Sequence, residues 1–283
     1  DYLHEVIDSV LGQTFEDFEF IISNNGSTDN TKKIIISYQQ LDKRVILFDH
    51  EDFGFSVSLN KAIGISKTHI IARIDGDDVM EPNRLEEQYN FLKNNKDVTL
   101  LSCLANYINA AGDIIGKTFS DLDSVEANHR YIAENEPIGL LHPGAMYYKS
   151  AFSEVGGYRT QFAPAEDIDL WNRFNDHGYW AVVQQKILMN YRMIPGSEIG
   201  KNFKKSRQKY EWLRECIWLR RAGKSEVKWE DFLEQQNRLP LIVKVNRTRK
   251  TQAKYLYRMA GIHFGAKKLV RCSLSLLGAL VLQ

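Results

Sequence analysis

Residues 70–78 have the sequence Ile-Ile-Ala-Arg-Ile-Asp-Gly-Asp-Asp, an apolar run that ends in the carboxylates Asp75, Asp77 and Asp78. Isoleucine favours a buried strand, and glycine lets the backbone turn sharply where that strand ends. Carboxylates this close repel one another unless a cation neutralises them, and hard oxygen ligands suit Mg²⁺ or Mn²⁺. The stretch therefore predicts a metal-assisted phosphate site at the end of a strand. An acidic turn that caps the following helix is the alternative.

Strand-like and helix-like segments alternate along the first 110 residues. We expect helices over residues 1–12, 30–38, 58–66 and 84–94, and strands over residues 18–23, 45–48, 70–74 and 99–106. Such alternation predicts an α/β fold with a mainly parallel sheet and helices on both faces. Residues 114–137 are less regular, and we expect an insertion or a lid there.

Charge divides the chain near residue 200. Residues 201–283 hold 20 Lys and Arg against 6 Asp and Glu, whereas residues 1–200 hold 17 against 30. We therefore expect a catalytic domain over residues 1–200 and a helical, basic extension over residues 201–283. This charge pattern suits a protein that works beside an anionic surface, either membrane lipid or nucleic acid.

The cysteines Cys103, Cys216 and Cys272 are scattered and lack metal-ligand spacing, which indicates free thiols in a reducing compartment. We see no signal peptide and no apolar run long enough to span a bilayer. The chain begins without methionine inside an expected helix, so we expect that upstream sequence is missing.

Five short motifs follow one another along the chain. They are Asn25-Gly26-Ser27-Thr28-Asp29, Ala72-Arg73-Ile74-Asp75-Gly76-Asp77-Asp78, Gly156-Gly157-Tyr158, Glu166-Asp167-Ile168-Asp169-Leu170-Trp171 and Tyr191-Arg192. In this order and at these spacings, residues 1–200 resemble family 2 glycosyltransferases, which have the GT-A fold, a Rossmann-like nucleotide-sugar-binding domain. The basic tail resembles no family that we can name.

The resemblance implies that a sugar moves from a nucleotide-diphosphate donor to an acceptor hydroxyl, with inversion and with help from Mn²⁺ or Mg²⁺. Asp77 matches the metal ligand of the family's Asp-x-Asp motif. Asp75 would contact the ribose or the metal through water, and Asp78 would support them. Arg73 could steady these carboxylates, reach the donor, or form a purely structural ion pair.

The resemblance also assigns the acceptor side. Asp167 matches the family's catalytic base, and Glu166 would orient the acceptor or that base; helix capping is the alternative for both. His142 could bind a sugar or simply pack. Trp171 could stack on a sugar face or belong to the core.

Three features depart from the family pattern. The apolar strand with which the family opens is absent. Asn24 and Asn25 stand where relatives often place aspartates that grip the base, which leaves the donor base open. Ile194 replaces a histidine before Pro195-Gly196, while Arg192 could still meet the phosphates.

The tail segments 203–222 and 252–282 are basic and amphipathic. Such helices can lie on an anionic membrane, or pack against the body with a solvated basic face. We do not expect nucleic-acid binding, because no recognised module accompanies the charge. Our expectation is an enzyme at the inner, cytoplasmic face of the cell membrane that extends a glycan or glycolipid acceptor in surface polysaccharide synthesis.

Two alternatives remain open from the sequence. A degenerate scaffold that binds sugar nucleotides without turnover would explain the absent strand, the two asparagines and Ile194. A phosphotransferase with Asp75 as nucleophile is less compatible, because such enzymes carry their Asp-x-Asp directly after a first strand.

Overall fold

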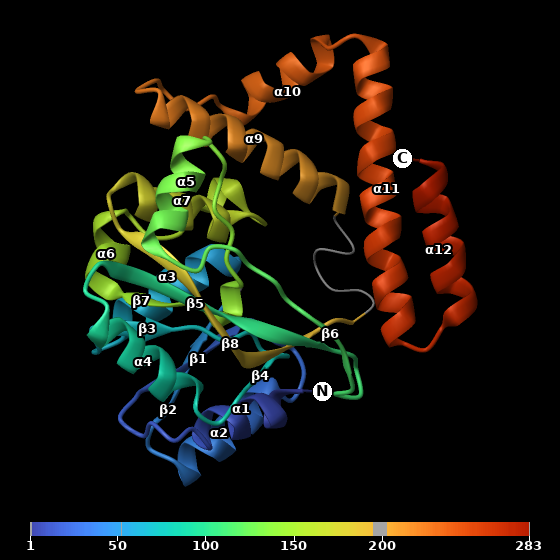
Figure 1. The fold of residues 1–283 in the computed structure, drawn as a ribbon. Helices are drawn as coiled ribbons and strands as arrows, with labels where there is room; N and C mark the ends of the chain where they lie inside the picture. The colour runs from blue at the N-terminus through green and yellow to red at the C-terminus, as the bar shows by residue number, and fades with distance from the viewer. Residues whose placement is uncertain (1, 52, 195–202, 283) are drawn as a thin grey trace. The chain divides into compact units, whose positions relative to one another are not determined.

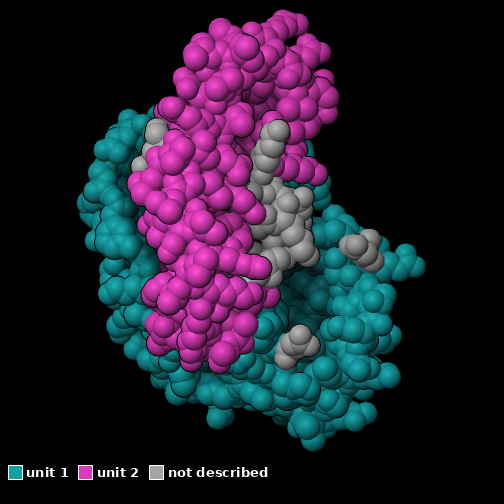
Figure 2. Space-filling view, turned by 90° about the vertical axis from the view of Figure 1, so that its right-hand side faces the viewer, with its two compact units in different colours: residues 1–106, 117–191 teal, residues 107–116, 192–283 magenta. Residues whose placement is uncertain are grey.

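The computed structural model describes residues 2–51, 53–194 and 203–282. The chain forms two compact units, coloured separately in Figure 2. The first unit comprises residues 1–106 and 117–191, and the second comprises residues 107–116 and 192–283. The predicted boundary near residue 200 remains a prediction, and Pro195-Gly196 lies outside the described residues.

Helices and strands alternate through the first unit as predicted (Figure 1). Its helices are α1 (Leu3–Leu11), α2 (Thr31–Leu41), α3 (Phe55–Ile65), α4 (Arg84–Asn94), α5 (Val125–Ala133), α6 (Lys149–Glu154) and α7 (Glu166–Asp176), with 3₁₀ turns η1 (His142–Gly144) and η2 (Thr160–Phe162). The strands are β1 (Phe20–Asn25), β2 (Val45–His50), β3 (Ile70–Ala72), β4 (Val79–Met80), β5 (Val98–Ile108), β6 (Ile114–Lys117), β7 (Met146–Tyr148) and β8 (Trp180–Arg192). Most of β6 and the last residues of β5 and β8 belong to the second unit.

The strands form two sheets. Strands β1 and β2 pair in parallel, with Asn25 opposite His50 at their carboxyl ends. The larger sheet has the order β3-β7-β5-β8-β4, with β6 beside β5. Its pairs β3–β7, β5–β7 and β4–β8 are antiparallel, so the expectation of a mainly parallel sheet is wrong for this sheet. The reason is that β7 and β8, which follow the regular alternation, insert between the earlier strands.

The core lies on both faces of the larger sheet. Neighbouring residues of one strand belong to different apolar clusters, as period-two alternation requires: Leu100 and Tyr147 pack in one, Leu101 and Met146 in the other. The first cluster also takes in residues of α6 and α7, and the second takes in residues of α1 and α4. The α/β class with helices on both faces is therefore confirmed.

The second unit is mainly helical. It contains α9 (Phe203–Arg221), α10 (Trp229–Arg238), α11 (Leu241–Gly265) and α12 (Leu269–Val281). The Trp212 indole donates to the Val227 carbonyl at 2.7 Å, and its ring lies 5.3 Å from that of Trp229. Within the described part of the chain, no helix combines the length and the apolar character needed to cross a bilayer.

The Gly-Gly-Tyr motif is explained by backbone conformation and by a close approach. Gly156 and Gly157 have φ values of +84° and +66°. A Cβ atom on Gly157 would lie 2.8 Å from the Asn60 Oδ1 atom. That oxygen accepts from the Tyr158 backbone N–H at 2.9 Å, while the Asn60 amide donates to the Tyr158 carbonyl at 2.8 Å.

We predict that Gly157→Ala lowers the free energy of unfolding by roughly 2 kcal/mol, because it combines an unfavourable φ with displacement of Asn60. Urea unfolding measures the change. Gly64→Ala in α3 is the matched control, because a Cβ atom there meets nothing within 4 Å; we expect it to be neutral or stabilising. Equal effects of the two substitutions would contradict this explanation.

Candidate active site

Arg73 and Asp75 form an ion pair directly after β3. The Arg73 Nη2 atom lies 2.6 Å from the Asp75 Oδ1 atom, with the arginine buried and the aspartate about one-third exposed. Although burial opposes its charge, the neighbouring Asp75 raises the pKa of Arg73, which keeps the guanidinium ionised. Its Nε and Nη1 atoms have no hydrogen-bond partner among the described residues. Arg73 therefore binds Asp75 through Nη2, while Nε and Nη1 remain available to donate hydrogen bonds to a ligand.

The other two aspartates of the motif point to different surroundings. Asp77 is partly exposed, whereas Asp78 is fully buried. The Asp78 charge acts on buried Arg84, whose pKa is lowered to about 10 by burial and raised by Cys103 and then by Asp78. Asp78 is therefore a buried neighbour of Arg84, and its supporting role in the site remains a prediction.

A divalent cation fits Asp75 and Asp77 in donor chemistry. Both offer carboxylate oxygens with partial access to solvent, and hard cations commonly bind through one or two carboxylates together with substrate phosphates. Among the residues that the structure describes, no group of three or more His, Cys, Asp or Glu side chains could hold a metal ion. A cation here would therefore take its remaining ligands from phosphate and water.

The first turn of α7 brings Glu166 and Asp167 to the same site. The pKa of Asp167 is raised to about 6, chiefly by burial; Arg73 offsets part of this rise, and Asp75 contributes a smaller increase. Burial and then the Asp167 charge raise the pKa of Glu166 to about 7. Because the charges of Arg73 and Asp75 act on the pKa of both carboxyls, Glu166 and Asp167 lie within electrostatic reach of that ion pair. The structure thus brings together residues almost 100 positions apart in the sequence.

Asp169, two residues after Asp167, is fully buried and paired with two arginines. It accepts hydrogen bonds from Arg159 and Arg173, with Nε–Oδ2 distances of 2.9 and 3.0 Å. Arg173 also donates to the carbonyls of Val155 and Gly157. Asp169 and Arg173 therefore have a structural role, because they join α7 to the segment that contains Val155 and Gly157.

His142 lies beside Tyr158, with 2.8 Å between Nε2 and the phenol oxygen. Burial, and then the charge of Arg73, lower the pKa of His142 well below its ordinary value, so its imidazole is neutral. The ring packs edge-on against Trp171 and Phe55. The structure brings His142 into the site, and its contact with a sugar remains a prediction.

Trp171 requires a correction. It is fully buried in the core, where its ring packs edge-on against Tyr147 and Phe174 as well as His142. A ring without exposed surface cannot stack on a sugar, so Trp171 supports the site from behind. The apolar spacing of the helix that contains it was the signal for burial.

The asparagines at the end of β1 also differ from each other. Asn24 is buried and its amide donates to Asp49 at 2.7 Å. The Asn25 Oδ1 atom accepts from the Ser58 hydroxyl at 2.7 Å and from the Phe53 backbone N–H at 3.1 Å. Of the two, Asn25 lines the cavity described next, so Asn25 is the one placed to meet a ligand.

A cavity of about 730 Å³ runs between β1 and β3, with α1 and α3 also contributing to its walls. Most of its lining is apolar, for example Ile21, Ile70 and Met146. Asn25, Ser58, Arg73, Asp75 and Tyr158 give it a polar lining where β1 and β3 end.

The sequence did not point to Phe55, or to the place of Tyr158 beside His142 and in the lining of the cavity. Phe55 is 48% exposed, and its ring centre lies 5.2 Å from the Arg73 guanidinium carbon. An aromatic residue directly after Gly54, following a strand end, was the available signal.

Arg192 belongs to the second unit, where it donates to the Asn109 carbonyl at 3.1 Å. Its contact with the donor phosphates stays a prediction.

Comparison with known proteins identifies the family. The family model described as "Glycosyl transferase family 2" matches residues 1–156, more than half of the chain. The chain belongs to glycosyl transferase family 2.

The curated proteins that the chain resembles are named glycosyltransferases. The chain is 32% identical over 194 residues to the uncharacterized glycosyltransferase MJ1057 of Methanocaldococcus jannaschii, covering 68% of this chain. It is 36% identical over 175 residues to the O-antigen biosynthesis glycosyltransferase WbnJ of Escherichia coli, covering 61% of this chain. Each match covers 66% of the relative, so the chain spans just under two thirds of their length.

Solved structures share the fold. The mannosyltransferase PcManGT from Pyrobaculum calidifontis, in complex with GDP-Man and Mn²⁺, matches with a TM-score of 0.58 and 17% identity, covering 99% of this chain and 82% of that one. S. aureus TarS 1–349 in complex with UDP-GlcNAc matches with a TM-score of 0.57 and 14% identity, covering 100% and 88%. At these identities the likeness establishes the GT-A fold alone.

The raised pKa of Glu166 predicts a pH-dependent stability change. Between its ordinary 4.5 and about 7, the unfolded chain releases the proton while the folded chain keeps it, so stability falls as the pH rises. Glu166→Gln removes this loss, and we expect a gain on the order of 1 kcal/mol at pH 8 that disappears at pH 4.

Thermal or urea unfolding at the two pH values measures the effect. Glu126→Gln is the matched control, because Glu126 also occupies a first helical turn but is exposed. A Glu166→Gln protein that is no more stable than wild type at pH 8 would contradict the stated electrostatics.

Proposed function

We propose that this protein is a metal-dependent inverting glycosyltransferase that moves a sugar from a nucleotide-diphosphate donor to an acceptor hydroxyl. One observation supports this function: the Asp167 carboxylate of α7 lies within electrostatic reach of the Arg73–Asp75 ion pair, which follows β3. A site that binds a diphosphate on one side and supplies a general base on the other suits displacement of the diphosphate by a hydroxyl.

The donor half comprises Asp75, Asp77 and Arg73. Asp77 would hold Mn²⁺ or Mg²⁺ directly, and Asp75 would bind it directly or through water, or contact the ribose. The cation supplies charge neutralisation for the leaving diphosphate. Arg73 has two buried nitrogens without partners among the described residues, which suits a further contact with an anionic donor. Asn25 and Phe55 would border the nucleoside.

The acceptor half comprises Asp167 and Glu166. A base with a pKa of about 6 is mostly ionised near neutral pH and still takes a proton more readily than an ordinary aspartate. Glu166, with a pKa of about 7, can keep its proton and donate a hydrogen bond to the acceptor. His142 and Tyr158 would form the wall behind the sugar.

The acceptor class is proposed from the relatives' names. Besides the O-antigen enzyme, they include the putative glycosyltransferase EpsE and the putative teichuronic acid biosynthesis glycosyltransferase TuaG of Bacillus subtilis. We propose a glycan or glycolipid acceptor in surface polysaccharide synthesis, at the inner face of the cell membrane. A scaffold without turnover is the second candidate, since the side chain of Asn24 is buried and already donates to Asp49.

Calorimetric titration of UDP, GDP, dTDP and CDP with Mn²⁺ tests the donor half. We expect one nucleotide to bind, and Asp77→Ala to weaken that binding at least tenfold, because the ligand that joins metal to diphosphate is gone. The matched control is Asp97→Ala, because Asp97 is an exposed aspartate directly before β5; this variant should bind as wild type does.

Equal metal-dependent binding by Asp77→Ala and wild type would contradict the assigned site. Turnover separates the two candidates: donor hydrolysis or transfer that requires Asp77 excludes the scaffold, while donor binding without turnover across many acceptors would establish it.

A further inference from the structure

The α12 helix is arranged with its large apolar side chains outward. Its exposed large residues are Leu269, Val270, Leu274, Leu276, Leu277, Leu280 and Val281. Its buried residues are the small Ser275 and Ala279. At 100° per residue the exposed set covers one broad face of the helix. A helix that packs on a water-soluble body normally shows the opposite pattern.

The partner helix α11 uses small residues in the same way. The two helices lie side by side as a hairpin within the second unit (Figure 1). The buried residues of α11 include Ala253 and Ala260. A Cβ atom on Gly278 of α12 would lie 2.9 Å from the Leu256 side chain, so Leu256 of α11 packs directly against the α12 backbone. Small residues between helices, with leucine and valine facing outward, are typical of helices in an apolar environment.

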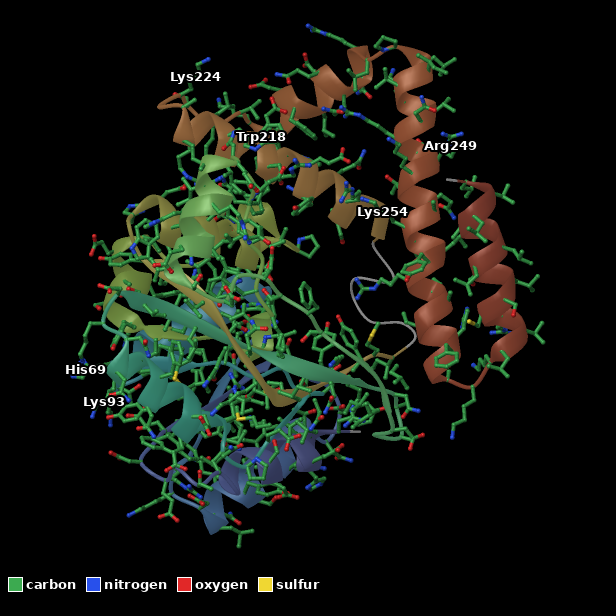
Figure 3. The ribbon with its side chains drawn as sticks, viewed as in Figure 1. His69, Lys93, Trp218, Lys224, Arg249 and Lys254 are labelled. Atoms are coloured by element: carbon green, nitrogen blue, oxygen red, sulfur yellow. The ribbon has the colours of Figure 1, made fainter. Side chains whose placement is uncertain are left out.

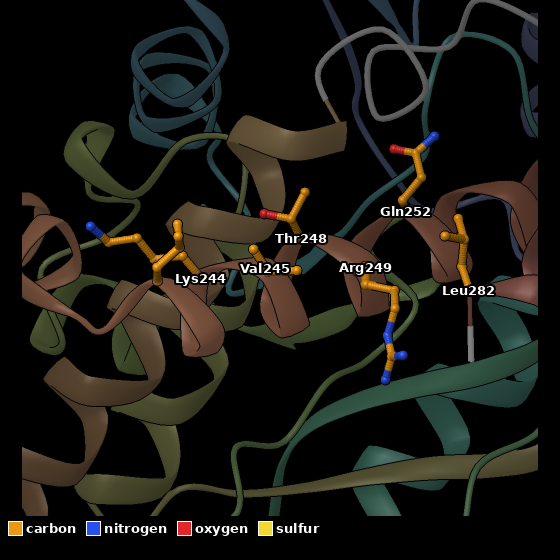
Figure 4. Close-up of a pocket in the computed structure, with 7 residues that line it drawn as sticks. Lys244, Val245, Thr248, Arg249, Gln252 and Leu282 are labelled. Carbon is orange, nitrogen blue, oxygen red and sulfur yellow. The ribbon is translucent and has the colours of Figure 1, made fainter.

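The apolar surface continues to the open end of the hairpin. There Leu241, Ile242 and Val245 at the start of α11 are exposed. A groove of about 580 Å³ lies at this end, and Figure 4 shows the side chains that line it. Its walls are formed by Leu241, Lys244, Val245, Thr248, Arg249, Gln252 and Leu282. Two cations and two neutral polar side chains thus border an apolar groove, an arrangement that suits a lipid chain beneath a phosphate head group.

The charge of the hairpin has a single sign. Residues 241–282 contain nine Lys and Arg and no Asp or Glu. Arg249 and Lys254 extend from α11 in Figure 3, and both are exposed. Lys267 and Lys268 are exposed directly before α12. Cations beside a broad apolar face match an anionic bilayer surface, which offers phosphate above and hydrocarbon below.

We propose that the α11–α12 hairpin is a membrane-docking device that lies in the head-group layer of an anionic bilayer. The outward face of α12 enters the hydrocarbon boundary, and the lysines and arginines of α11 bind lipid phosphates. The 13 residues of α12 extend only about 20 Å, less than the hydrocarbon thickness of about 30 Å, so the helix lies along the surface. The biological purpose of this docking rests on the proposed function. Its binding to lipid can be measured without any transfer reaction.

Flotation of the whole chain with vesicles tests the docking device. We expect binding to vesicles of equal phosphatidylglycerol and phosphatidylcholine, and at least tenfold weaker binding to phosphatidylcholine alone. Leu274→Glu with Leu277→Glu should weaken binding at least tenfold by placing charge on the apolar face. Arg249→Gln with Lys254→Gln should reduce binding to the anionic vesicles and its dependence on salt.

Leu41→Glu in α2 is the matched control, since Leu41 is an exposed leucine of the first unit and should leave binding unchanged. Circular dichroism and nucleotide titration of each variant show that the fold and the donor site persist. Loss of vesicle binding with nucleotide binding intact supports docking, whatever the outcome for turnover. Absence of vesicle binding by wild type overturns it, as does a lipid-free dimer that the leucine variants dissociate, which would make this face a contact between two copies of the chain.

Discussion

The candidate active site depends on a buried ion-pair network around Asp169. This fully buried carboxylate is held by Arg159 and Arg173, and Arg173 in turn binds the carbonyls of Val155 and Gly157. The network fixes the first turn of α7 against the Gly-Gly-Tyr segment. Removal of one partner would leave an uncompensated buried charge, which costs several kilocalories per mole in typical proteins. The positions of Asp167, Glu166 and Tyr158 follow from it.

Carboxylates only a few residues apart therefore have different chemical roles. Asp169 is neutralised by two arginines, whereas Glu166 and Asp167 face the site with raised pKa values of about 7 and 6. Arg73 limits that rise and also holds Asp75. The Arg73 guanidinium thus links the proposed donor and acceptor halves. A change of charge in either half therefore changes the pKa values in the other.

Local patterns predicted the helices and the strand ends that position the site. The helix over residues 84–94 has the predicted bounds, and the order of motifs correctly predicted the family, whose model matches residues 1–156. Strand direction was wrong because alternation does not specify how later strands insert into a sheet. Burial of Trp171 and the place of Phe55 depend on contacts between distant segments.

The central claim is that Asp167 takes the acceptor proton at a site assembled around Arg73 and Asp75. The most direct measurement is the pH dependence of kcat/KM for sugar transfer, compared with Asp167→Asn. Because the base must be ionised, we predict a tenfold rise per pH unit that levels off above an apparent pKa of about 6. Asp167→Asn should lose at least about 100-fold in kcat/KM while nucleotide binding persists. A variant with wild-type transfer and the same pH profile would contradict the account.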